Sequence, residues 1–334
     1  PMGSVTLGLT VDPSPPNLIT DLNVEIGPGA GGGGEPAAVP TAALEPAVRT
    51  AVIDSVAKLL ERLYPSADTG RIIGERLRQR EREGAYARMA TLADFASAVT
   101  QDMRSVNGDR HLNLGPPRQR RPGGGPGGPG GGGMVLEQRV LEGNVGYVRF
   151  GPLSAAPEEI ARLAETFRAL QSTGAMILDF RGAPGGSAEA ANQIISHFTA
   201  PDLPSLHVVN RSEGTDFVRR TLARVPGPRR TDVPLYVLID GRSGSAAEDV
   251  PFVLQNLGRA TLVGERTAGA GRNNMIVPVG GGLSASISVS RVSDPRTGRE
   301  WEAIGVQPDL AVPSADALEA ARRAAVARMG RGGR

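Results

Sequence analysis

The sequence has 334 residues, 40% of them hydrophobic, which is enough for about two domains with a sizeable core. It contains no cysteine, which excludes disulfides, thiolate metal sites and a cysteine nucleophile. The formal charge is only +2, and the basic residues are dispersed arginines with one lysine, Lys58, so we do not expect nucleic-acid binding.

The first 45 residues carry no clear pattern. Short apolar stretches between Val5 and Ile26 are interrupted by prolines, and residues 27–40 are of low complexity. We therefore assign no element to residues 1–45. No apolar run in the whole chain approaches the ~18 residues of a transmembrane helix.

Residues 46–114 are predicted to form a small helical domain. Apolar residues recur at helical spacing from Val52 to Leu63 and again from Ile72 to Leu77. Thr91 and Asp94 form a capping-box pattern that begins a further helix. A histidine, His111, follows that helix, where a cation is usually a surface or capping residue that favours the helix dipole.

Residues 115–134 include the run PPRQRRPGGGPGGPGGGG, which has no strict period of three. This composition predicts a flexible linker rather than collagen. Because it cannot bury enough apolar surface to become ordered, we expect the linker to be disordered.

Residues 135–334 alternate strand and helix patterns and predict an α/β domain. Helices are expected from Pro157, after Ser187, from Ala246 and over Leu318–Met329. We expect the strands to form one mixed sheet: Val145–Phe150, Ala175–Phe180, Leu206–Val209, Leu235–Ile239, Ala260–Val263, Met275–Val279 and Leu283–Val289.

Two turns in this domain could carry chemistry. Gly185 and Gly186 lie in the turn RGAPGGS, which is either a simple tight turn or one that brings backbone N–H groups close to a reacting carbonyl. It is no Walker loop, because no lysine follows the glycines. Ser245 begins the helix at Ala246, and is either an N-cap or a nucleophile beside the free N–H groups of a helix start.

Three stretches in this order resemble the carboxy-terminal processing serine peptidases: ILDFRGAPGGSAE from Ile177, YVLIDGRSGSAAEDVPFVLQNLGRATLVGERTAGAG from Tyr236, and WEAIGVQPDL from Trp301. That family includes the tricorn-core peptidases and the modules of interphotoreceptor retinoid-binding protein. TLADFASAVTQDMRSVNGDRHLNL resembles the end of the N-terminal domain in the retinoid-binding branch. The resemblance implies an α/β core of the crotonase-like (ClpP/crotonase) superhelical kind, preceded by the helical domain.

The resemblance also implies which base the serine uses. In the lysine-dependent branch of the family, the base and its assisting acid would stand where this sequence has Ala270 and Asn256. Lys58 lies far away in the N-terminal helices and is expected to be solvated. We therefore do not expect a serine–lysine dyad.

The tricorn-like branch uses serine, histidine and glutamate, which implies Ser245 as nucleophile, His111 as general base and Glu302 as the residue that orients the histidine. The implied oxyanion donors are the N–H groups of Ala246 and of Gly185 or Gly186.

One position departs from that branch, because Arg110 stands where a serine would relay the glutamate to the histidine. Glu302 could pair with Arg110 instead, or Asp109 could replace it. Glu248 is either a partner of the helix dipole or a second residue that orients the site.

Two functions remain open. The first is a serine endopeptidase that cleaves extended or unfolded polypeptide, works without a cofactor or metal, and lacks the PDZ domain that many processing peptidases carry near the linker. The second is a catalytically silent module that binds a hydrophobic, retinoid- or lipid-like ligand.

The opening Pro1-Met2-Gly3-Ser4 is typical of an expression remnant. We expect an exported protein, periplasmic or extracellular, whose signal peptide is missing from this sequence.

Overall fold

The computed structural model describes residues 5–11, 19–26, 44–117 and 133–332. The chain divides into two compact units, residues 1–40 and 41–334. The first unit holds β1 (Val5–Val11) and β2 (Ile19–Ile26), which pair antiparallel although the sequence pattern predicts no element there. The prolines that obscure the pattern fall between the two strands. The predicted linker lies outside the described residues from 118 to 132.

The second unit begins with the expected helices, α1 (Pro46–Leu63), α2 (Ala67–Arg82) and α3 (Leu92–Arg104). Two of these helices have N-caps, because the hydroxyl of Ser66 accepts the N–H of Thr69 and the hydroxyl of Thr91 accepts the N–H of Asp94. The apolar faces of the helices pack together with two strands that come much later in the chain. Buried residues from both parts form this core: Val52, Val56, Leu60, Ile73, Leu77, Phe95, Val99, Met103, Leu283, Ala285 and Ile287.

The remaining strands form two sheets, whereas the sequence pattern predicts one. A six-stranded mixed sheet has the order β13-β10-β9-β6-β5-β4, parallel except where β4 meets β5. Its strands are β4 (Val135–Leu141), β5 (Val145–Phe150), β6 (Ala175–Asp179), β9 (Leu235–Ile239), β10 (Thr261–Gly264) and β13 (Leu310–Ala311). Runs of buried apolar residues on β6 and β9 fit the centre of a sheet covered on both faces.

The second sheet is antiparallel and has the order β11-β12-β7-β8, with β3 pairing to β12. Its strands are β3 (Asn113–Gly115), β7 (Pro204–Asn210), β8 (Thr215–Arg220), β11 (Asn273–Gly280) and β12 (Leu283–Ser293). The strands predicted at Leu206–Val209, Met275–Val279 and Leu283–Val289 thus exist, but they belong to this sheet. Strand pairing over long sequence separations cannot be read from local patterns.

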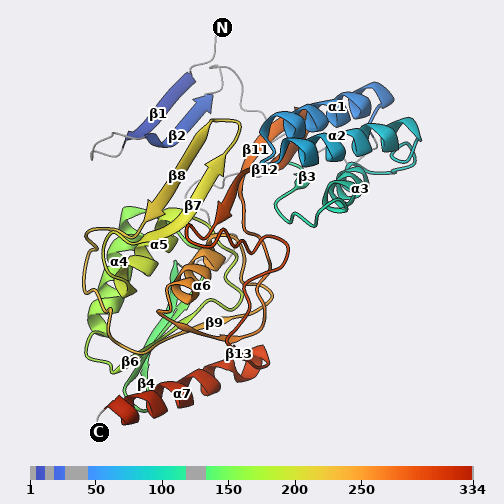
Figure 1. Ribbon diagram of the computed structural model, residues 1–334. Coiled ribbons are helices and arrows are strands. Elements are labelled where there is room, and N and C mark those ends of the chain that lie inside the picture. The colour runs from blue at the N-terminus through green and yellow to red at the C-terminus, as the bar shows by residue number, and fades with distance from the viewer. Residues whose placement is uncertain (1–4, 12–18, 27–43, 118–132, 333–334) are drawn as a thin grey trace, which may run out of the picture. The chain divides into compact units, whose positions relative to one another are not determined.

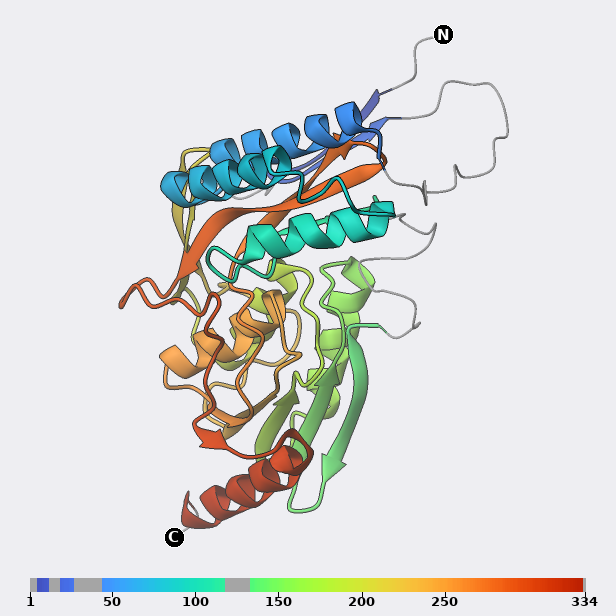
Figure 2. The same cartoon turned by 90° about the vertical axis from the view of Figure 1, so that its right-hand side faces the viewer.

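Helices cover both faces of the six-stranded sheet. On one face α4 (Pro157–Ala169), α5 (Ala188–Phe198) and α6 (Ala246–Asn256) enclose the main apolar core. On the other face lies α7 (Ala317–Gly332), whose small residues Ala317, Ala321 and Ala325 let it approach the strands closely. Figures 1 and 2 show α7 at the opposite end of this unit from α1–α3. In the part of the chain that is described, no helix combines the length and the apolar character needed to cross a bilayer.

Strand β12 connects the helical region to the α/β core. Residues 284–286 pair with β3, which begins two residues after His111, and residues 291–293 pair with β7. Since β12 also contributes to the core of α1–α3, it fixes the loop that carries His111 against the rest of the unit.

Candidate active site

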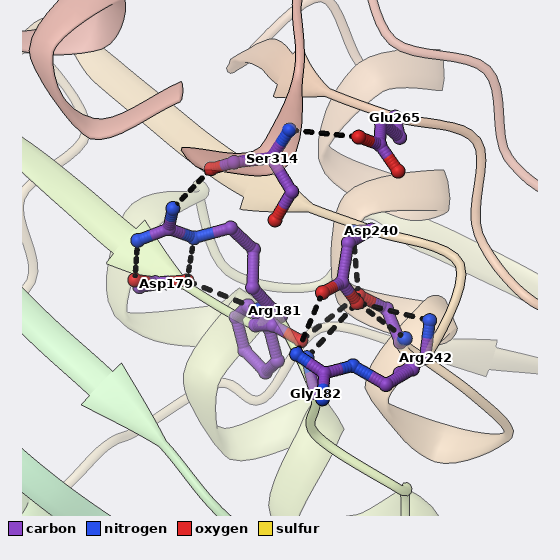
Figure 3. A network of polar contacts seen from close by, with 9 residues as sticks. Asp179, Arg181, Gly182, Asp240, Arg242, Glu265 and Ser314 are labelled. Carbon is purple, nitrogen blue, oxygen red and sulfur yellow. Dashed lines mark hydrogen bonds and ion pairs between the residues drawn. The ribbon is translucent and has the colours of Figure 1, made fainter. Parts of the chain in front are cut away.

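The turn after β6 and the turn after β9 are joined by one carboxylate. Asp240 at the end of β9 accepts N–H groups from Gly182 at 3.0 Å and from Arg242 at 2.9 Å (Figure 3). Burial alone would raise the pKa of Asp240, but these donors and the Arg242 guanidinium hold it below its ordinary value. Ser243 adds a bond from its hydroxyl to the Phe180 carbonyl, at 2.9 Å. The glycine-rich turn and the Ser245 turn are therefore held together as one rigid pair.

A second carboxylate anchors the start of the glycine-rich turn. Asp179 at the end of β6 accepts the backbone N–H and the guanidinium of Arg181 and the hydroxyl of Tyr147. Arg181 also donates to the carbonyl of Ser314, just before α7 (Figure 3). These bonds tie the turn to the opposite face of the sheet.

Ser245 occupies a strained backbone conformation at the start of α6. Its φ of 53° and ψ of −134° are rare for a residue with a side chain, and such geometry costs about 1–3 kcal/mol. The first N–H of the helix, on Ala246, has no acceptor among the described residues. The sharp turn presents the serine hydroxyl beside an unpaired backbone donor.

Gly185, which is followed by Gly186, packs directly against this serine. Both have positive φ, 100° and 132°, which a residue with a Cβ rarely adopts. A methyl group on Gly185 would lie 2.7 Å from the Ser245 Cβ and 3.0 Å from the Ala246 nitrogen. Glycine is thus required for the two turns to come this close.

His111 is held by the loop that follows α3. The Asp109 carboxylate, fully buried, accepts the backbone N–H of His111 at 2.9 Å and the hydroxyl of Tyr64 at 2.8 Å. Arg104 donates to the carbonyls of Leu112 and Arg110 and so closes the loop. Asp109 therefore fixes the backbone of His111, and it forms no hydrogen bond or ion pair with the ring.

The His111 ring and Ser245 meet although 134 residues separate them in the sequence. The His111 Nε2 lies 3.3 Å from the Ser245 Oγ, within reach for proton transfer. Burial lowers the pKa of His111, Arg272 and Arg104 lower it further, and Asp109 opposes them. The imidazole is therefore neutral near pH 7 and can accept a proton. Its Nδ1 is buried and has no hydrogen-bond partner in the described part of the chain.

Glu302 lies in the loop after β12, close to the same histidine loop. Its Oε2 accepts the N–H of Gly271 at 2.7 Å and lies 4.0 Å from the Arg272 Nε, whereas its Oε1 is buried without a partner among the described residues. Burial raises the pKa of Glu302 to about 7, and Asp109 adds to this effect. Arg110 is exposed and forms no ion pair within the described residues, so the predicted alternative of a Glu302–Arg110 pair is wrong.

Arg272 is the cation of the site, and the sequence interpretation did not identify it. Its Nη1 lies 3.7 Å from Asp109, and its guanidinium carbon lies 5.1 Å from the centre of the Tyr64 ring. It stands between the carboxylates of Asp109 and Glu302. The available signal was its place two residues after Ala270, in the stretch that carries the base in the lysine-dependent branch.

The Glu248 carboxylate anchors the turn that carries Ser245. Its carboxylate accepts N–H groups from Ser245 at 2.9 Å and from Gly269 and Ala270 at 2.8 Å, together with the Thr267 hydroxyl at 2.5 Å. Burial raises its pKa although all these donors favour the charged form. Of the two roles considered for Glu248, its contacts fit the residue that orients the site.

A pocket of about 170 Å³ opens beside Ser245. It is lined by Gly186, Ala188, Ser245, Ala246, Asp249, Ala270, Gly271, Arg272, Asn273, Asn274 and Val292. Within the described ranges, no three metal-binding side chains gather at one place. The site thus combines a hydroxyl, a neutral imidazole, an unpaired backbone N–H and a small pocket.

Solved structures with this fold include peptidases. A putative peptidase from Parabacteroides merdae superposes with a TM-score of 0.60 and 18% identity, over 86% of this chain and 97% of that one. The photosystem II D1 C-terminal processing protease superposes with a TM-score of 0.53 and 16% identity, over 83% and 97%. These similarities confirm the predicted fold, an α/β core preceded by helices.

The family itself is shown by comparison of sequences. The carboxyl-terminal-processing protease of Synechocystis is 32% identical over 171 residues, which are 51% of this chain and 38% of that protein. The carboxy-terminal processing protease CtpB of Bacillus subtilis is 25% identical over 185 residues, 55% of this chain and 37% of that protein. The chain thus spans well under half the length of these relatives.

The family model named N-terminal domain of peptidase S41 in eukaryotic IRBP matches residues 39–122. The model of peptidase family S41 itself matches residues 144–312, half of the sequence, so the chain belongs to that family.

Proposed function

We propose that the protein is a serine endopeptidase in which Ser245 is the nucleophile and His111 the general base. The observation that carries this proposal is the 3.3 Å contact between the His111 Nε2 and the Ser245 Oγ. Ser245 attacks a peptide carbonyl while His111 takes its proton, and His111 then returns that proton to the leaving amine. A water molecule, deprotonated by the same histidine, hydrolyses the acyl-enzyme and restores the serine.

The oxyanion that forms during this attack needs donors, and the two joined turns supply them. The N–H groups of Ala246, Gly185 and Gly186 donate no hydrogen bond among the described residues, Gly185 lies against the serine, and Gly186 lines the same pocket. Donors that are already in place cost no reorganisation when charge develops, and losing one typically lowers kcat by about 10²–10³-fold. The strain at Ser245 and the positive φ of the two glycines serve this arrangement.

Glu302 is proposed as the third member of the site. The buried Nδ1 of His111 and the buried Oε1 of Glu302 both lack partners among the described residues, and one is a potential donor and the other an acceptor. Asp109 holds the backbone of the histidine, and Arg272 balances the two carboxylates. No hydrogen bond joins the two side chains in the structure. We propose that Glu302 turns its free oxygen to Nδ1 during the reaction and stabilises the imidazolium of the transition state, without a relay serine at position 110.

The proposed substrate is an extended or unfolded polypeptide. This rests on the relatives, which are named carboxyl-terminal-processing proteases. Residues 118–132, between β3 and β4, are too few for a PDZ domain at that point, since domains have about 50 residues or more. We therefore propose that the active-site cleft itself selects substrates, and we place the activity outside the cytoplasm, as the family resemblance implies.

The proposal is tested with a fluorophosphonate probe, which reacts with activated serines. We expect one adduct, on Ser245, that is lost in Ser245→Ala and strongly slowed in His111→Ala. Ser212→Ala, which removes an exposed serine in the turn between β7 and β8, is the control and should label like the unchanged protein. Labelling at another serine, or equal labelling of Ser245→Ala, would contradict the assignment.

A further inference from the structure

The pocket beside Ser245 contains a carboxylate that the proposed mechanism does not use. Asp249 follows Ser245 by one turn of α6, so both side chains lie on the same face of the helix. Both line the pocket together with Gly186 and Ala246, which belong to the two turns that supply the oxyanion donors. At about 170 Å³ the pocket is smaller than the ~300–1,000 Å³ of a typical small-molecule site and suits a single side chain.

One oxygen of this carboxylate remains open. The Asp249 Oδ2 lies 3.3 Å from the Arg219 Nη1 on β8, whereas its Oδ1 has no hydrogen-bond partner among the described residues. The side chain is only 11% exposed. Burial raises the pKa of Asp249 to about 6, Arg219 lowers it and the neighbouring Glu248 raises it, so the group is mostly ionised at pH 7.5.

The rest of the lining does not neutralise Asp249. Arg272 reaches the pocket, but its charge is matched by Asp109 and Glu302 behind it. Asn273 and Asn274 contribute neutral amides, and Ala188, Ala246, Ala270 and Val292 contribute apolar walls. The pocket therefore offers an incoming side chain a partly buried anionic acceptor.

We propose that Asp249 determines the specificity of the site, by selecting lysine or arginine as the residue whose carbonyl is attacked. This inference rests on the proposed function. In a serine peptidase the side chain of that residue lies beside the nucleophile and the oxyanion donors, which is where this pocket opens. A cationic side chain would form a charge-assisted hydrogen bond with the open Oδ1. An apolar side chain would cover the carboxylate without satisfying it, which a site built to bond a polar group strongly disfavours.

The test compares two fluorogenic peptides that are identical except for lysine or methionine before the cleaved bond. For the unchanged protein, we expect kcat/KM to favour the lysine peptide by about tenfold or more, since a hydrogen bond to a charged group is worth that factor. Asp249→Asn keeps the shape and should lower this lysine-to-methionine ratio about tenfold, whereas Asp249→Glu should retain a preference for lysine.

Arg219→Gln provides the opposite perturbation. It frees the second carboxylate oxygen and removes a competing cation, so the preference for lysine should increase. A purely structural ion pair would not shift the ratio in opposite directions when either partner is changed. Glu213→Gln, which removes a negative charge from the exposed turn before β8, is the control and should leave the ratio as it is.

The outcomes separate this inference from the proposed function. If Ser245 is labelled and peptides are cleaved, but methionine is accepted as well as lysine, or Asp249→Asn leaves the ratio unchanged, the role of Asp249 is refuted and the peptidase proposal stands. If Ser245 is not labelled and neither peptide is cleaved, the proposed function itself is refuted, and the inference with it.

Discussion

Glu302→Gln is the most informative single change, because it keeps the shape of the side chain and removes its charge. Burial raises the pKa of Glu302 from 4.5 to about 7, Asp109 contributes to the increase, and Arg272 and the Gly271 N–H oppose it. The side chain is only 7% exposed, so solvent screens it little. At 1.36 kcal/mol for each pKa unit, the folded protein disfavours the ionised form by about 3 kcal/mol.

The effect on stability has a definite sign. Between pH 4.5 and 7 the folded protein retains the Glu302 proton while the unfolded chain has lost it, so the free energy of unfolding decreases as pH rises through this window. Glutamine does not titrate. We therefore expect Glu302→Gln to match the unchanged protein near pH 4 and to be more stable by up to about 3 kcal/mol at pH 8. Urea unfolding at the two pH values measures this difference.

The effect on activity has the opposite sign. Glu302 is charged only above pH about 7, whereas His111, whose pKa burial lowers, is already neutral there. The kcat/KM of the unchanged protein should therefore increase with pH through about 7. In Glu302→Gln it should fall by up to about 10⁴-fold at pH 8, as when a triad carboxylate is replaced. The remaining activity of the variant should still rise with pH, but through a lower pH range than in the unchanged protein, because only His111 then titrates.

Two results would refute this argument: a variant less stable than the unchanged protein at pH 8, or a kcat/KM that stays constant for the unchanged protein between pH 6 and 8. Glu300→Gln is the matched control two residues earlier. The Glu300 carboxylate forms a partly exposed ion pair with Arg291, so its loss should change stability by no more than about 1 kcal/mol at either pH.

Three further variants test the supporting residues. Glu248→Gln replaces a buried carboxylate that accepts several hydrogen bonds, so the free energy of unfolding at pH 8 should decrease by about 2 kcal/mol or more, and unchanged urea unfolding would contradict this. Gly185→Ala places a methyl group 2.7 Å from the Ser245 Cβ at a positive φ, so fluorophosphonate labelling should slow more than about tenfold, and a normal rate would refute the close packing of the turns. Lys58→Ala changes an exposed residue of α1 and should leave kcat/KM within about twofold, since a larger loss would point to a lysine base.

Much of the local structure could be predicted from the sequence. The helices α1, α3 and α4 follow from apolar spacing together with the Thr91 cap and Pro157 at a helix start, and the central strands β6 and β9 follow from unbroken apolar runs. These signals work because backbone hydrogen bonds and caps join residues a few positions apart. The position of Ser245 at the start of a helix, next to small residues, could be predicted from neighbouring residues in the same way.

Strand pairing was not predictable in this way. β3 has only the residues Asn113–Gly115, and β8 is exposed along almost its whole length, so neither shows an apolar pattern. The assignment of β7, β11 and β12 to a separate sheet depends on contacts between distant parts of the chain, which a local pattern does not encode.

The active-site residues also divide into those that the sequence identified and those that only the tertiary structure revealed. The residue types and their order in the sequence, with the family resemblance, were enough to identify Ser245, His111 and Glu302 as candidates. Only the tertiary structure placed Arg272 between Asp109 and Glu302 and brought Asp249 into the lining of the pocket. Burial also raises the pKa of Glu302 and lowers that of His111, because the free energy of a buried charge depends on which groups surround it in space.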